Sequence, residues 1–178
     1  RLGAALMSQL DYERALASFN KARAINATDP WLFINMGTTL SQLGQSSEAI
    51  NAFQQALLLD KNSAEAYLRL GQLYIHNNNF IAAEEALIKA CQLQDDSYHI
   101  QLSLADAYQC NSKYDLAIKH YFAADKLQPK SQNIYTKLDK LILYGGSKKN
   151  ESLLDNLAEE LDRDQGMQSW INAWLVEE

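Results

Sequence analysis

The chain has 178 residues, of which 47% are hydrophobic and 21% charged, and these fractions are typical of a globular protein and not of a disordered one. No run of 18 apolar residues and no basic start followed by an apolar run is present, so we expect neither a membrane span nor a signal peptide, and a cytoplasmic protein. The net charge is −6: residues 151–178 hold eight acidic residues and one basic (−7), and the rest is near neutral (+1). Because phosphate binding needs a basic surface, we expect no nucleic-acid partner.

Residues 1–29 hold one short and one longer helical pattern, with small residues at Gly3, Ala15 and Ala22. These residues match positions eight, twenty and twenty-seven of a unit that repeats through the following residues. The chain therefore begins inside a repeat, and we expect an exposed apolar surface at that end. We infer that Arg1 is not the natural start of the protein, or that earlier residues are disordered.

Residues 30–63, 64–97 and 98–131 are three consecutive units of 34 residues that align without insertion or deletion. Each unit contains two helical patterns separated by turn-prone residues, as in "LGQSS" at 43–47. Asp29 followed by Pro30 fits a helix N-cap with proline at the first helical position. Small residues recur at position eight (Gly37, Gly71, Ala105), position twenty (Ala49, Ala83, Ala117) and position twenty-seven (Ala56, Ala90, Ala124).

Gly71 stands in the middle of the helical pattern "AYLRLGQLY", where an interior glycine costs about 1 kcal/mol relative to alanine. That cost is offset if the missing side chain lets the two helices of a unit approach closely. A single unit cannot bury both its faces, so neighbouring units must stack. The sequence therefore predicts an all-α solenoid of antiparallel helix pairs.

Residues 132–146 continue the first-helix pattern through Tyr135 and Leu138, although Asp139 replaces the small residue at position eight. Residues 147–178 are acidic and contain two amphipathic stretches, which we expect to be helices that cap the C-terminal end of the solenoid. Alternatively, the stretch that carries Trp170 and Trp174 docks a partner or a second copy of the chain.

The cysteines and histidines form no pattern typical of a metal or catalytic site. Cys91 and Cys110 make no CxxC motif, and we expect small buried thiols. His76, His99 and His120 lack metal-ligand spacing, so they are interpreted as solvated or packing residues. We expect no cofactor, no metal and no enzymatic activity in these residues.

The 34-residue period, the small residues at its fixed positions and Pro129 at position thirty-two resemble the tetratricopeptide repeat family. The resemblance implies a right-handed superhelical solenoid in which the first helix of each unit lines a concave groove for partners. By the same resemblance, positions two, five, six, nine, twelve and thirteen face that groove. The implied partner-binding residues are Trp31, Ile34, Asn35, Thr38, Glu65, Leu68, Arg69, Gln72, Ile75, His99, Leu102, Asp106 and Gln109.

Position five carries Ile34, Leu68 and Leu102, an apolar line framed by polar residues, as peptide binding requires. The same line would also fit packing between helices, and the sequence leaves both possibilities open. We expect a non-catalytic scaffold that binds an extended or helical peptide segment of a partner protein. The alternatives are the adaptor arm of a larger enzyme, such as a transferase, and an RNA-binding helical repeat, which the neutral-to-acidic body disfavours.

Overall fold

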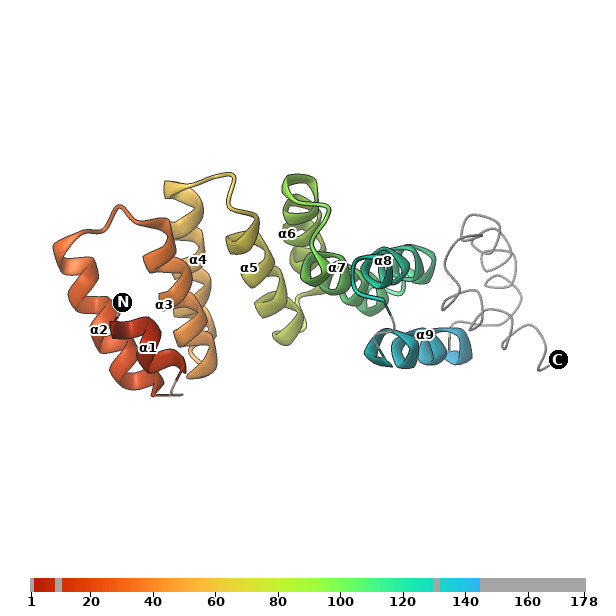
Figure 1. Ribbon diagram of the computed structural model, residues 1–178, viewed down its shortest axis with the longest axis horizontal. Helices are drawn as coiled ribbons and strands as arrows, with labels where there is room; N and C mark the ends of the chain where they lie inside the picture. The colour runs from red at the N-terminus through yellow and green to blue at the C-terminus, as the bar shows by residue number, and fades with distance from the viewer. Residues whose placement is uncertain (1, 9–10, 130–131, 145–178) are drawn as a thin grey trace. The chain divides into compact units, whose positions relative to one another are not determined.

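A computed structural model describes residues 2–8, 11–129 and 132–144, and these residues form helices joined by short turns, with no strand among them (Figure 1). The expected all-α class is confirmed. Within these residues no helix is both long and apolar enough to cross a bilayer. The helices are α1 (Leu2–Ser8), α2 (Tyr12–Ile25), α3 (Pro30–Gln42), α4 (Ser46–Leu59), α5 (Ala64–His76), α6 (Phe80–Leu93), α7 (Tyr98–Cys110), α8 (Tyr114–Leu127) and α9 (Gln132–Tyr144).

The chain divides into two compact units, Arg1–Asp95 and Asp96–Glu178. In the N-terminal unit, α1 pairs with α2, α3 with α4 and α5 with α6, and each pair packs on the next through α2 against α3 and α4 against α5. In the C-terminal unit, α7 pairs with α8, and α9 packs against α8. Helix pairs therefore follow the 34-residue period, as expected. The predicted capping helices at 147–178 lie outside the described residues.

The turn inside each complete unit has the same backbone geometry. Gly44, Asn78 and Ser112 all stand at position fifteen and have φ between 57° and 74°, the left-handed region in which a helix commonly ends. In the first unit the Gln45 amide donates to the Leu40 carbonyl at 2.9 Å, a bond repeated one and two periods later. This bond pattern closes the first helix of each unit and turns the chain into the second.

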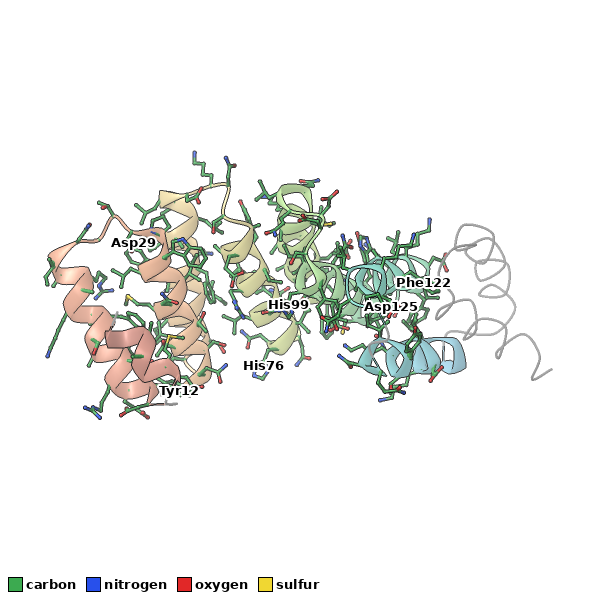
Figure 2. All side chains as sticks on the ribbon, viewed as in Figure 1. Tyr12, Asp29, His76, His99, Phe122 and Asp125 are labelled. Atoms are coloured by element: carbon green, nitrogen blue, oxygen red, sulfur yellow. The ribbon has the colours of Figure 1, made fainter. Side chains whose placement is uncertain are left out.

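The start of α3 confirms the capping prediction. The Asp29 side chain, labelled in Figure 2, accepts a hydrogen bond from the Trp31 amide at 3.0 Å, and Pro30 is the first helical residue. Proline costs nothing there because the first amides of a helix have no partner within the helix. The cap therefore fixes where α3 begins, and with it the register of Trp31.

The glycines at position eight allow the close helix approach that the sequence predicted. A Cβ placed on Gly71 would lie 2.5 Å from Leu87 Cγ, and one on Gly37 would lie 2.7 Å from the Phe53 ring. Gly3 stands in the same relation to Phe19, at 2.5 Å. In every case the opposing residue stands at position twenty-four, on the second helix of the same unit. The second helix thus occupies the volume that an alanine methyl would need.

The alanines at positions twenty and twenty-seven complete this contact. Those of the three complete units are 0% exposed, whereas Ala22, at position twenty-seven of the first segment, is exposed. Ile25 is 88% exposed, while its equivalents Leu59, Leu93 and Leu127 are 42–44% exposed. Position twenty-seven is covered in each complete unit but not beside the seven-residue α1. An apolar surface is therefore exposed at this end, as expected.

Candidate functional site

The predicted partner-binding residues lie on α3 and α5 of the N-terminal unit and on α7 of the C-terminal unit. Their exposure separates them into three groups. The exposed residues are Trp31, Arg69 and His99; the half-buried ones are Asn35, Thr38, Glu65, Gln72, Ile75, Leu102, Asp106 and Gln109; the buried ones are Ile34 and Leu68. The exposed and half-buried residues of each unit define what we call its first-helix face.

The apolar line at position five is not a surface feature in the N-terminal unit. Ile34 is 3% exposed and belongs to the core cluster that α2, α3, α4 and α5 share, and Leu68 is 4% exposed. Leu102, by contrast, is half-buried. Of the two possibilities that the sequence left open, packing therefore applies to Ile34 and Leu68. The prediction that Ile34 and Leu68 contact a partner is therefore corrected, because a ligand cannot reach side chains that neighbouring helices enclose.

The accessible part of the N-terminal unit's first-helix face is aromatic and polar. Trp31 is 58% exposed, and no other Phe, Tyr or Trp of described burial is exposed. Glu65 and Arg69, one turn apart on α5, form an ion pair with a nitrogen–oxygen distance of 2.7 Å. The Thr38 hydroxyl donates to the Ile34 carbonyl at 2.9 Å and is thus free only to accept. This face offers one large apolar anchor beside hydrogen-bonding groups.

Two residues of the C-terminal unit's first-helix face, Asp106 and Gln109, form a polar cluster with Tyr121 of α8 and Lys137 of α9. The Tyr121 hydroxyl lies 2.5 Å from Asp106 Oδ1 and 2.6 Å from Gln109 Oε1. The ammonium group of Lys137 on α9 bonds the same Asp106 oxygen and lies 5.7 Å from the centre of the Tyr121 ring. Three helices thus meet in one network that we call the Asp106 cluster.

Electrostatics keep the Tyr121 hydroxyl protonated and therefore able to donate. Burial, followed by the neighbouring Asp106 carboxylate, raises the pKa of Tyr121 far above its usual range. The phenol proton therefore stays in place at neutral pH, and the Asp106 carboxylate accepts a charge-assisted hydrogen bond from it.

Sequence reasoning identified Asp106 and Gln109 but missed Tyr121 and Lys137 as members of a site. Tyr121 stands at position twenty-four, on the second helix of its unit, and its ring is 0% exposed. A signal existed: the equivalent residues Phe53 and Leu87 carry no polar group, so a hydroxyl at this position needs a partner. Lys137 lies 31 residues beyond Asp106. That distance in sequence hides the ion pair unless the repeat register is used.

His120 of α8 packs against α7. Its ring stacks on Tyr108 with centroids 5.4 Å apart, and Nδ1 lies 2.7 Å from Gln101 Oε1, which makes this nitrogen the donor. His76 and His99, which are labelled in Figure 2, are by contrast exposed. The expectation of solvated and packing histidines is confirmed.

Acid is expected to destabilise the protein through His120. Burial lowers the pKa of His120 below its ordinary value of 6.5, so below pH 6.5 the unfolded chain binds a proton that the folded chain binds less readily. The free energy of unfolding therefore falls as the pH drops from 6.5 through the folded pKa. Urea midpoints at pH 7.5 and 5.5 should show a smaller drop for His120→Gln than for the original chain. His76→Gln, on an exposed histidine, is the control and should leave the drop unchanged.

The cysteines differ from the expectation of buried thiols. Cys91 is half-buried, and Cys110, the last residue of α7, is exposed. Burial of the sulfur, followed by the Asp106 charge, nonetheless raises the pKa of Cys110. Among the described residues, no group of three or more His, Cys, Asp or Glu is placed to hold a metal ion.

Two family models match the chain. One, described as "TPR repeat", matches residues 37–78, and one described as "Tetratricopeptide repeat" matches residues 64–97, the second of the 34-residue units. The second match has the same boundaries as the unit derived from the sequence. The resemblance stated above is therefore confirmed.

Relatives and solved structures agree with this family. Small glutamine-rich tetratricopeptide repeat-containing protein 2 of Mycosarcoma maydis is 31% identical over 99 residues, which cover 56% of this chain and 28% of the relative. The peroxisomal targeting signal receptor of Candida albicans is 34% identical over 90 residues, which cover 50% of this chain and 14% of that relative. The crystal structure of MamA has a TM-score of 0.73 at 22% identity, covering 80% of this chain and 83% of that one, and shows the shared fold. The chain spans less than a third of the length of these two curated relatives.

Proposed function

Because this chain is built from tetratricopeptide repeats, we propose that it is a protein-interaction scaffold that binds a peptide segment of a partner on its first-helix faces. The observation that carries this proposal is Trp31, a large aromatic side chain left 58% exposed on α3 beside core residues that are fully packed. Exposed aromatic residues are enriched among the anchors that dominate binding energy. The name of one relative, a peroxisomal targeting signal receptor, supports a role in recognition.

The neighbouring polar groups suit an extended or helical peptide. Asn35 and Thr38 follow Trp31 along α3, and Arg69 with Glu65 lies on α5, which contacts α3. An apolar anchor framed by hydrogen-bonding side chains is the usual composition of a peptide-binding surface. The same face would serve an adaptor arm of a larger enzyme, so the measurements below apply to that alternative too.

The proposal is tested by selecting a random dodecapeptide library on the immobilised 178-residue chain and measuring dissociation constants of the enriched peptides by fluorescence anisotropy. Trp31→Ala is expected to weaken binding about tenfold or more, because truncating an aromatic anchor typically costs more than about 1.4 kcal/mol. The matched control is Leu58→Ala on the second helix α4, which removes an apolar side chain 69% exposed and should leave the affinity unchanged. Equal weakening by both changes, or no enriched peptide, contradicts the proposal.

A further inference from the structure

The Asp106 cluster is a feature of one unit and breaks the pattern of the others. It combines position nine of a unit, position twenty-four of the same unit and position six of the next. Here these positions are Asp106, Tyr121 and Lys137, two charges and a hydroxyl. The corresponding trios are Thr38, Phe53 and Arg69 in the first complete unit and Gln72, Leu87 and Ser103 in the second. Three matched polar residues in one trio mark this point of the first-helix face as chemically distinct.

The buried Tyr121 side chain supports the Asp106 cluster. The Tyr121 ring is 0% exposed, and its hydroxyl fixes the Asp106 carboxylate at 2.5 Å. A phenol has a single proton, so the two oxygens that face the Tyr121 hydroxyl compete for it, and the charged Asp106 carboxylate is the stronger acceptor. This buried support distinguishes the Asp106–Lys137 pair from mobile surface ion pairs, which contribute little.

Asp106 and Lys137 keep unused hydrogen-bonding capacity. The side chains of Asp106 and Lys137 are each 28% exposed. Among the described side chains, the hydrogen bonds to Asp106 fall on Oδ1, so Oδ2 can accept a further hydrogen bond. The Lys137 ammonium has three protons and directs one of them at Asp106. A donor and an acceptor thus stand side by side, and their charges cancel.

We infer that the Asp106 cluster is a specificity subsite for a carboxamide, the side chain of an Asn or Gln in a bound peptide. The carboxamide oxygen would accept from Lys137 Nζ, and its NH₂ group would donate to Asp106 Oδ2. A carboxylate in that place would meet the Asp106 charge, and an ammonium group would meet the Lys137 charge. The inference rests on the proposed function, since it needs a peptide on this face.

The test uses the same library on the full chain. The enriched peptides should carry Asn or Gln at one fixed position, and replacing that residue with Ala should weaken binding about tenfold, the value of one or two charge-assisted bonds. With the Lys137→Met variant this preference should fall below about twofold. Lys137→Arg keeps a charged donor and should retain part of the preference. Lys140→Met, which removes an exposed lysine from the same helix, is the matched control and should behave like the original chain.

The outcomes separate the two proposals. Peptides that enrich without a carboxamide at a fixed position, or an Asn-to-Ala difference that Lys137→Met leaves intact, overturn the subsite alone. A failure to enrich any peptide overturns the proposed function and the subsite with it. A purely structural role for the pair would lower the melting temperature of Lys137→Met while leaving the Asn-to-Ala ratio unchanged, and that result also counts against the subsite.

Discussion

Ile34→Glu is expected to unfold the N-terminal unit. The Ile34 side chain is 3% exposed and lies in the core cluster with Ala15, Met36 and Phe53. The change removes a buried aliphatic side chain and places a charge in an apolar interior, so the expected loss is about 4 kcal/mol or more. That is a large part of the 5–15 kcal/mol by which domains are typically stable. Urea denaturation followed by circular dichroism measures the effect.

Trp31→Glu is the matched control, because it places the same charge on the same helix three residues earlier. Trp31 is 58% exposed, and a surface substitution of this kind usually changes stability by less than about 0.5 kcal/mol. The pair of variants separates packing from binding: Ile34→Glu should lose structure, and Trp31→Glu should lose only peptide affinity. Equal denaturation midpoints for the two variants would place Ile34 at the surface and restore it as a candidate contact.

The fold was predictable because the residues that pack the helices together recur every 34 residues. Gly37, Gly71 and the alanines at positions twenty and twenty-seven recur every 34 residues, and one helix contact repeated in register explains all of them. The turns were predictable as turns, although the left-handed geometry of Asn78 and Ser112 was not, since neither residue type demands it.

The site was less predictable, because a sequence period gives spacing but not the exact rotation of a helix. Ile34 stands at the edge of the apolar stripe of α3, and whether such a residue faces a neighbour or solvent depends on how closely the next helix packs. The Asp106 cluster was hidden for a different reason. Its bonds join three helices, and side-chain partners 15 and 31 residues apart depend on tertiary geometry.

Gly71→Ala is expected to destabilise the protein, although alanine is the better helix former. The added methyl would lie 2.5 Å from Leu87 Cγ and 2.9 Å from Leu87 Cδ2, and Leu87 is itself 0% exposed, so neither helix can yield cheaply. Overpacking of this kind typically costs 1–3 kcal/mol, against a gain in helix propensity of about 1 kcal/mol. We expect a net loss of up to about 2 kcal/mol, seen as a lower urea midpoint.

A double-mutant cycle with Leu87→Ala identifies the cause, because that change removes the atoms that the new methyl would meet. Leu87→Ala alone should cost 2–5 kcal/mol through the cavity that it leaves. In its background, Gly71→Ala should change sign and stabilise the protein by about 1 kcal/mol, since the helix gain then acts without the clash. A Gly71→Ala penalty that is the same in both backgrounds would mean that the glycine serves something other than this contact. The close pairing of first and second helices, which keeps the core residues buried and leaves residues such as Trp31 at the surface, would then need another explanation.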